Sequence, residues 1–250
     1  MAKKARRQEL ELRTAIVAAC RHMNAIGLNQ GTSGNISARF GDRMLITPSG
    51  VPYHEMAAED LAVMPIDGDY GSWEGPLAPS TEWRFHLDIT RARPEVGAIV
   101  HAHSTFATAL AIARKDIPAC HYMIAAAGGP TIRCASYATY GTKELSDAAL
   151  RALEDRNACL LANHGMIATG PNLDKAMWLA IELETIARQY VISLSIGGPV
   201  LISDAEIAKV KEGFKSYGPR ARDRADADPA GPPAEAAVEG FGVRGRGGIA

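Results

Sequence analysis

The apolar and polar positions of the chain follow two periods. Helical spacing of apolar residues predicts amphipathic helices over 8–25, 82–93, 106–113, 141–154, 173–194 and from 203 to about 217. Short apolar runs predict strands over 36–40, 44–47, 61–66, 99–104, 132–137 and 159–170, the last being two strands joined at 163–165. Because helices and strands alternate, the pattern indicates an α/β protein.

Length and composition narrow the class of protein. The chain has 250 residues, enough for one sizeable α/β domain, and we expect that domain over 1–220. Beyond Arg220 the chain is mostly Arg, Asp, Ala, Pro and Gly, so we expect a disordered tail over 221–250. Apolar residues make up 47% and charged residues 22%, with a net charge of −1, which predicts no nucleic-acid partner.

The sequence also indicates the cellular location of the protein. No run of 18 or more apolar residues occurs, and the basic first residues lack the apolar core of a signal peptide. The four cysteines are scattered, unlike those of a secreted disulfide scaffold. We therefore expect a soluble, cytoplasmic protein with no membrane partner and with reduced cysteines.

His101 and His103 lie two residues apart in the predicted strand over 99–104. Residues at this spacing on an extended strand point to the same face, so the two imidazoles lie side by side, as in a metal chelate. An otherwise apolar strand has little reason to bury two imidazoles unless something coordinates them. The alternative is an ordinary polar pair at a strand end, and the pair alone does not decide between the two.

Three other features of the sequence help to decide whether the histidine pair binds a metal. Residues 29–37 are a run of glycines and small polar residues, either a plain turn or a loop that surrounds an anion with amides. Glu82, at the start of a predicted helix, is either a metal ligand or a favourable charge beside the helix dipole. His164 lies at the tip of the 163–165 turn. Three histidines and one carboxylate are a plausible ligand set for a catalytic zinc with a replaceable position.

Longer blocks of sequence carry a family resemblance. In chain order these are GLNQGTSGNIS, MLITPSG, PSTEWRFH, VHAHS, PACHYMIAAAGG, YATYGTKELS, NHGMIATGPNLDKAMWLA and FKSYGPR. With these blocks the chain resembles the class II aldolase/adducin family, and within it the bacterial L-fuculose-1-phosphate aldolases, over about residues 10–220. The resemblance implies a three-layer α/β/α fold with a central, mostly antiparallel sheet flanked by helices.

The resemblance also implies roles for single residues. His101, His103 and His164 are the implied zinc ligands, and Glu82 is the fourth ligand until substrate displaces it, after which it is the catalytic acid and base. Manganese or cobalt could replace the zinc. The implied phosphate pocket is lined by Gly34, Asn35, Ser49, Gly50, Ser80 and Thr81. Close relatives often carry Thr where this chain has Ser49 and Ser where it has Thr81. Both residues keep a hydroxyl group, so the resemblance still implies phosphate binding.

Three tyrosines complete the implied site. Tyr122 matches a tyrosine that protonates the aldehyde oxygen from a neighbouring subunit, and Tyr217 matches a second residue that reaches across the interface. Tyr140 stands where the fuculose enzymes carry Phe on the aldehyde side, which leaves the preferred aldehyde open. The resemblance implies a homotetramer with active sites at its subunit interfaces.

The implied reaction is the reversible cleavage of a ketose 1-phosphate to dihydroxyacetone phosphate and an aldehyde. L-fuculose 1-phosphate and a 5-deoxy or 5-methylthio pentulose 1-phosphate are the candidate substrates. Pentulose-5-phosphate 4-epimerase and methylthioribulose-1-phosphate dehydratase activities stay open, and a non-catalytic adducin-like module is a remote alternative. Lys115, Lys143 and Lys175 lie in polar segments, which argues against a Schiff base. His86, four residues after Glu82, could support the carboxylate.

Overall fold

A seven-stranded sheet forms the centre of the protein in the computed structural model, which describes residues 2–214. Its strand order is β3-β2-β1-β4-β7-β6-β5, and every neighbouring pair is antiparallel except β5 with β6. The strands are β1 (Asn35–Phe40), β2 (Arg43–Ile46), β3 (Ala62–Pro65), β4 (Ala98–Ala102), β5 (Arg133–Ala135), β6 (Ala158–Leu161) and β7 (Gly165–Gly170). Strands β4 and β7 are adjacent, so the histidine-bearing segments meet at the middle of the sheet.

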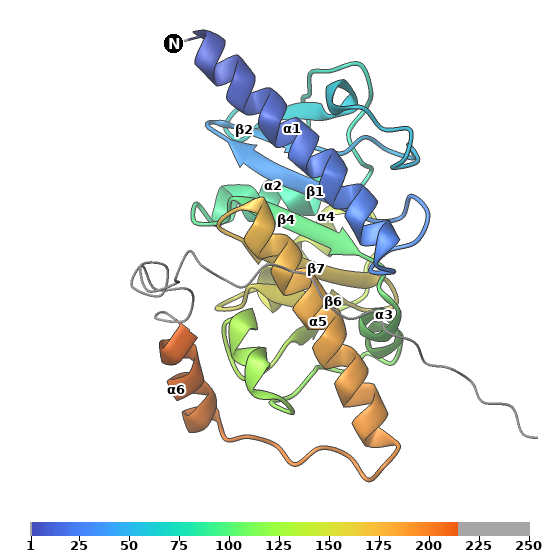
Figure 1. Cartoon of the computed structure of the whole chain (residues 1–250), viewed down its shortest axis with the longest axis vertical. Coiled ribbons are helices and arrows are strands. Elements are labelled where there is room, and N and C mark those ends of the chain that lie inside the picture. The colour runs from blue at the N-terminus through green and yellow to red at the C-terminus, as the bar shows by residue number, and fades with distance from the viewer. Residues whose placement is uncertain (1, 215–250) are drawn as a thin grey trace, which may run out of the picture. The chain divides into compact units, whose positions relative to one another are not determined.

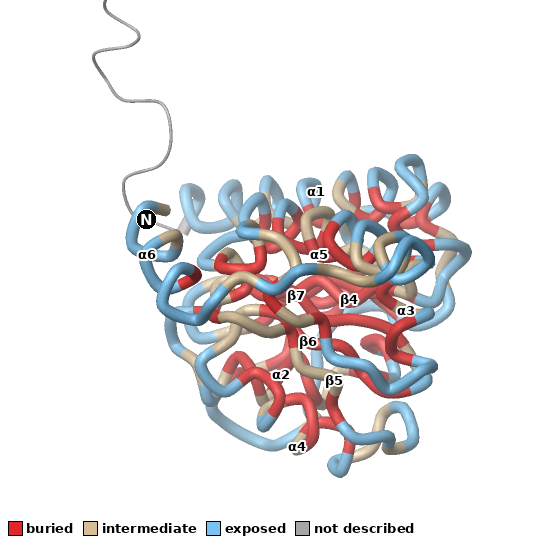
Figure 2. Tube along the Cα trace, turned by 90° about the horizontal axis from the view of Figure 1, so that it is seen from below, coloured by how far each residue is buried: buried red, intermediate tan, exposed pale blue. Residues whose placement is uncertain are grey.

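Helices cover both faces of this sheet. Figure 1 shows α1 (Ala2–Ala25) and α5 (Leu173–Leu194) in front of it, with α2 (Trp83–Ala92) and α4 (Lys143–Ala152) behind. Figure 2 shows the same three layers from below, with buried chain between them. Helix α3 (Thr105–Ile112) packs against α5. Two short 3-10 helices, η1 (Ala58–Asp60) and η2 (Tyr122–Ala127), lie in the connections, and α6 (Asp204–Phe214) packs on η2. The expected three-layer α/β/α fold with a mostly antiparallel sheet is confirmed.

Alternation along β4 assigns its side chains to the two layers. Val100 and Ala102 belong to the core beneath α1 and α5, whereas Ile99 belongs to the core beneath α2 and α4. His101, two residues after Ile99, faces the same side, where its ring meets the Phe85 ring edge-on at 5.4 Å. The sheet therefore places His101 toward α2, the helix that Glu82 precedes.

Several element boundaries differ from the sequence expectations. Helix α1 begins at Ala2 instead of Gln8, because its first two turns are alanines and long basic residues, which favour a helix without showing apolar periodicity. The strand expected over 99–104 ends at Ala102, so His103 lies just beyond it. The strand expected over 132–137 ends at Ala135. The predicted tail over 221–250 lies outside the described residues. Among the described helices, none has the length and apolarity needed to cross a membrane.

Candidate metal centre

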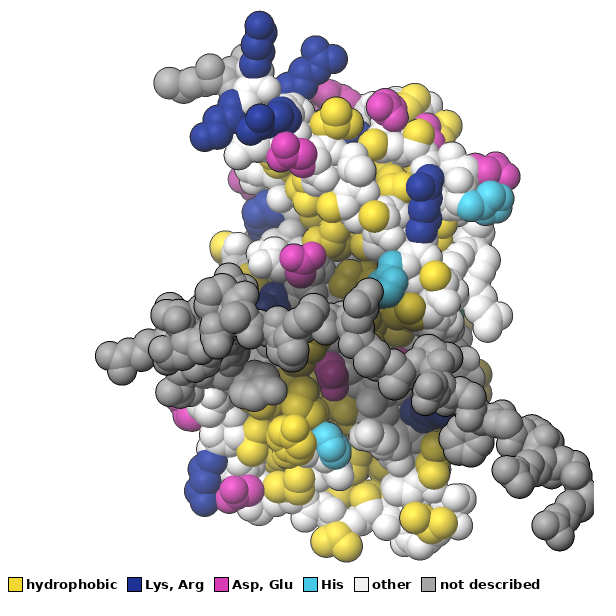
Figure 3. Space-filling model, viewed as in Figure 1, with side chains coloured by type: hydrophobic (Ala, Val, Ile, Leu, Met, Phe, Trp, Pro, Cys, Tyr) yellow, Lys and Arg dark blue, Asp and Glu magenta, His cyan; other side chains and the backbone are white. Residues whose placement is uncertain are grey.

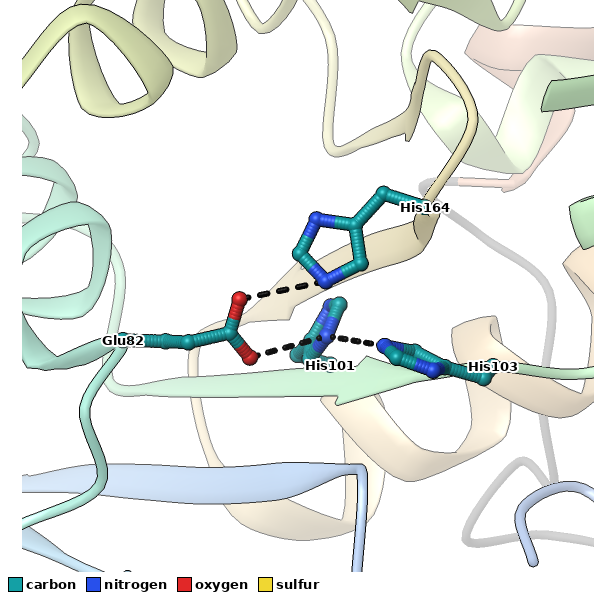
Figure 4. A group of neighbouring side chains, drawn as sticks. All are labelled: Glu82, His101, His103 and His164. Carbon is teal, nitrogen blue, oxygen red and sulfur yellow. Dashed lines mark hydrogen bonds and ion pairs between the residues drawn. The ribbon is translucent and has the colours of Figure 1, made fainter. Parts of the chain in front are cut away.

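Four side chains that are distant in the sequence converge at one end of β4. His101 comes from β4, His103 from the residue after its end, His164 from the β6–β7 turn and Glu82 from the residue before α2 (Figure 4). His101 Nε2 lies 3.0 Å from His103 Nε2 and 3.1 Å from Glu82 Oε2. His164 Nε2 lies 3.1 Å from Glu82 Oε1. One nitrogen or oxygen from each residue lies within 4.8 Å of the others, so the four predicted ligands do form one cluster.

The β6–β7 turn brings His164 over β4 through two unusual positions. Asn163 has a φ of +56°, a left-handed conformation that reverses the chain just before His164. Gly165 then begins β7, and a Cβ there would lie 2.6 Å from the Ala102 carbonyl oxygen and 2.8 Å from Cδ2 of His103. A side chain at 165 would therefore push the turn away from the other two histidines.

The donor set of the cluster fits a divalent metal. The Nδ1 of His101 lies 2.9 Å from the Met166 carbonyl oxygen, which only accepts hydrogen bonds, so this nitrogen carries the proton and Nε2 offers a lone pair. That lone pair faces His103 Nε2 at 3.0 Å, and Glu82 Oε1 is buried without a hydrogen bond. Tetrahedral ligands about 2.1 Å from a metal would lie roughly 3.4 Å apart. A divalent cation among these atoms would accept the lone pair of His101 Nε2 and pair with the otherwise unbonded Glu82 Oε1.

Burial and charge shift the pKa values in the cluster. Burial by itself favours the protonated form of Glu82, but His101 and His164 outweigh it and hold the Glu82 pKa well below its usual range. Burial, followed by the nearby His101 and His164, lowers the pKa of His103 from 6.5 to about 4. The carboxylate is therefore ionised and the His103 imidazole neutral at neutral pH, as metal ligands must be.

Glu82 occupies the N-cap position of α2 but makes no capping hydrogen bond, because its carboxylate turns into the cluster. Asn35 Nδ2 donates to Glu82 Oε2 at 2.9 Å. His86, considered as a support for the carboxylate, contacts Asn35 Oδ1 at 2.5 Å. Its support for Glu82 therefore passes through Asn35, which the sequence had indicated only as part of a phosphate loop.

A cavity of about 450 Å³ opens beside the cluster. The expected substrate residues that line it are Gly34, Asn35, Ser49, Gly50, Ser80, Thr81 and Tyr140, together with Glu82, His103 and His164. Sequence reasoning missed others on its wall, namely Thr32, Ser33, Pro48, Tyr137, Ala138 and Asn163. Thr32 and Ser33 belong to the glycine-rich loop and Asn163 precedes His164, so position in those motifs was the signal that could have found them. Within residues 2–214, no lysine or arginine lines the cavity.

The remaining predicted residues lie elsewhere. Tyr122 begins η2, is 49% exposed and does not line the cavity of its own chain. Tyr217 lies outside the described residues. Lys115, Lys143 and Lys175 are exposed, which agrees with the expectation that no buried lysine amine serves the site.

Comparison with known proteins identifies the family of the chain. The family profile described as "Class II Aldolase and Adducin N-terminal domain" matches residues 14–191. A 5-methylthioribulose-1-phosphate/5-deoxyribulose-1-phosphate aldolase of Rhodospirillum rubrum is 49% identical over 213 residues, which cover 85% of this chain and 95% of the relative. The L-fuculose phosphate aldolase of Escherichia coli strain K12 is 50% identical over 211 residues, which cover 84% and 97%.

A solved structure is also similar in fold to this chain. An L-fuculose 1-phosphate aldolase matches with a TM-score of 0.78 and 41% identity, covering 82% of this chain and 96% of that one. The profile match spans well over half of the chain, and both relatives are aligned over nearly their whole length. The chain belongs to the class II aldolase and adducin family.

Proposed function

We propose that the protein is a zinc-dependent class II aldolase that cleaves a ketose 1-phosphate reversibly to dihydroxyacetone phosphate and an aldehyde. The observation that carries this proposal is the cluster of Glu82 with His101, His103 and His164 at the wall of a cavity rich in hydroxyl groups. Relatives named for cleavage of 5-methylthioribulose 1-phosphate, 5-deoxyribulose 1-phosphate and L-fuculose phosphate support the substrate class. The complete histidine set favours an enzyme over a non-catalytic adducin-like module.

The cavity wall would bind the phosphate group. Ser49, Ser80 and Thr81 offer hydroxyl donors, and Gly34 and Gly50 let the backbone approach closely. Ser80 and Thr81 lie just before Glu82, the N-cap of α2, whose N-terminal amides favour an anion. Because no cationic side chain of the described residues lines this cavity, the phosphate would be held by neutral donors and by that helix end.

The proton transfer would fall to Glu82. His101, His103 and His164 would hold the metal with Glu82, and when bound the metal supplies a Lewis acid that stabilises the negative charge left on the ketone half after carbon–carbon cleavage. Glu82 is ionised, buried and held by Asn35, so it can accept and return a proton at the reacting carbon. Tyr140 stands at the outer wall, where the aldehyde end would lie.

Zinc suits three imidazoles and one carboxylate, and manganese or cobalt are the alternatives to test in the same site. A homotetramer with Tyr122 contributed by a neighbour remains a proposal, as does a cytoplasmic location. Figure 3 shows hydrophobic side chains gathered on the lower half of the face in view. Ile192 and Leu194 near the end of α5, and Ile196, Val200 and Leu201 just after it, are at least half exposed, which is typical of an interface.

Product analysis tests the proposal. Zinc-loaded protein is incubated with L-fuculose 1-phosphate, 5-deoxyribulose 1-phosphate and 5-methylthioribulose 1-phosphate, and dihydroxyacetone phosphate is assayed with a coupled reductase. We expect product from at least one substrate, loss of activity in EDTA and resistance to borohydride. Absence of dihydroxyacetone phosphate from all three would rule the aldolase out. A dehydrated product from 5-methylthioribulose 1-phosphate would then identify the dehydratase alternative, and epimerisation of a pentulose 5-phosphate added in a separate incubation would identify the epimerase.

A further inference from the structure

A row of buried polar side chains leads from β1 to the carboxylate of Glu82. Ser37 Oγ lies 2.7 Å from His86 Nδ1, and His86 Nε2 lies 2.5 Å from Asn35 Oδ1. Asn35 Nδ2 donates to Glu82 Oε2 at 2.9 Å. Asn35, Ser37 and His86 are 4%, 1% and 0% exposed, so water does not complete these contacts.

The carboxylate fixes the direction of every hydrogen bond in the row. Ionised Glu82 only accepts, so Asn35 must turn its NH₂ group toward it and its Oδ1 toward His86. That oxygen also only accepts, so His86 must carry its proton on Nε2. The bare Nδ1 of His86 then accepts from the Ser37 hydroxyl. All three groups donate toward Glu82, which leaves one consistent arrangement of protons.

The framework around the row is rigid. Asn35 and Ser37 lie two residues apart on β1 and share the face toward α2, while His86 lies on α2 and its ring stacks on Phe85 at 4.6 Å. Asn35 also pairs with His101 across β1 and β4. The row therefore connects the strand beside His101 with the helix that begins just after Glu82.

We propose that His86 is a positioning residue: through the amide of Asn35, it holds the Glu82 carboxylate in the orientation that faces the three histidines. Without the Nε2–H donor, Asn35 Oδ1 loses its partner on α2, so the amide that holds the carboxylate is no longer anchored and can shift. Glu82 then swings away from the cluster. The role of Glu82 in turnover rests on the proposed function, whereas its place in the metal cluster can be measured without any substrate.

The test compares His86→Leu with His86→Gln. Leucine removes the donor, while the amide nitrogen of glutamine can replace Nε2–H. Thr90→Val is the matched control, because Thr90 is also buried on α2 and its hydroxyl contacts only the Met44 sulfur, at 3.6 Å. Zinc affinity is measured by competition with a chromophoric chelator, alongside kcat, KM and the Tm of the metal-free protein.

We expect His86→Leu to weaken zinc binding and to lower kcat by about 10- to 100-fold each, with KM changed by less than about threefold. His86→Gln recovers most of both losses, and Thr90→Val changes neither quantity even where it lowers Tm. Wild-type zinc affinity in His86→Leu would overturn the proposal, as would equal losses in His86→Leu and His86→Gln. Where His86→Leu fails to fold, Ser37→Ala decides, since a smaller loss of zinc affinity supports the role and no loss overturns it.

These measurements separate two kinds of failure. If the wild-type protein cleaves none of the sugar phosphates, the proposed function fails, but the zinc affinities still report on His86. If the wild-type protein is active and zinc affinity is the same in every variant, only the positioning role fails.

Discussion

Glu82 combines burial with a negative charge, two properties that ordinarily oppose each other. It is 5% exposed, and His101 and His164, each 3.1 Å from one of its oxygens, hold its pKa well below the usual range despite that burial. Its position at a helix start, taken alone, favoured a charge beside the helix dipole, and only the family resemblance implied a metal ligand. The contacts that bring it beside three histidines involve residues that are distant in the chain, so its own position could not show them.

Replacing this carboxylate tests its chemical role. Glu82→Gln keeps the size of the side chain but removes the group that can accept a proton, so we expect kcat to fall by about 10²- to 10⁴-fold. Steady-state kinetics on zinc-loaded protein, with bound zinc quantified in the same sample, gives the measurement. Near-normal turnover in Glu82→Gln would show that another group transfers the proton.

The buried imidazole of His86 predicts how stability depends on pH. Burial, assisted by His101 and opposed by Glu82, lowers the His86 pKa from 6.5 to about 3. Between those values the unfolded chain binds more protons than the folded one, so the free energy of unfolding falls as pH falls, by up to about 1.4 kcal/mol per pH unit from this group. Urea unfolding of metal-free protein at pH 7.5, 6 and 5 measures the slope.

His86→Gln provides the comparison for that slope, because glutamine does not titrate. We expect the variant to lose less stability than the wild type between pH 6 and pH 5. His103, whose pKa is lowered to about 4, remains in both proteins and contributes equally. Parallel curves for the two proteins would contradict the assignment of the slope to His86.

The β4–β7 pair is the element that assembles the metal cluster. Apolar runs predicted both strands and the turn at 163–165, since those features are local in the sequence. The pairing of Ala102 with Met166 and the close approach of Gly165 to two histidines were not predictable, because they depend on which strands become neighbours in the sheet. Periodicity identifies a strand and its buried face but does not give the strand order.

Gly165→Ala tests that close approach. The added Cβ would lie 2.6 Å from the Ala102 oxygen, a backbone atom that cannot rotate away, so β7 or β4 must shift. We expect zinc affinity to fall at least about 10-fold and the free energy of unfolding to fall by about 1–3 kcal/mol. Gly213→Ala in α6 is the control, because a Cβ there meets nothing within 4 Å. Unchanged zinc binding in Gly165→Ala would show that the turn adapts freely.

Helix α3 offers a second test at this scale, because it follows the His103 segment and takes its cap from another element. Glu184 on α5 accepts from the amides of Phe106 and Ala107 at 2.8 and 2.9 Å, whereas Ser104 makes no capping contact. Glu184→Ala leaves both amides unpaired, so we expect a loss of about 1–2 kcal/mol in urea unfolding. Glu182→Ala, on the same helix, controls for helix propensity. Equal stability of the two variants would contradict the capping role.

The layers of the whole molecule were predictable from the sequence, whereas the tetramer rests on the family resemblance alone and stays a prediction. Family resemblance gave the α/β/α arrangement, and long amphipathic segments such as 173–194 gave its outer layers at the correct residues. The role of Tyr122 cannot be derived from a single chain. It was assigned a catalytic role, yet it is half exposed and does not line the cavity of its own chain, so its role requires a second subunit. Sequence periodicity describes one chain and carries no information on such a contact.

Mixing two inactive proteins tests whether subunits share sites. Each site would combine Glu82 of one chain with Tyr122 of its neighbour, so Glu82→Gln and Tyr122→Phe tetramers are each expected to be nearly inactive. After dissociation and joint reassembly at equal amounts, about one site in four pairs an intact Glu82 with an intact Tyr122, and we expect about a quarter of wild-type activity. Reassembly of each variant alone is the control and should recover nothing. If the mixture stays inactive although light scattering shows hybrid tetramers, Tyr122 does not serve a neighbouring site, and a fully active monomer would exclude the shared site altogether.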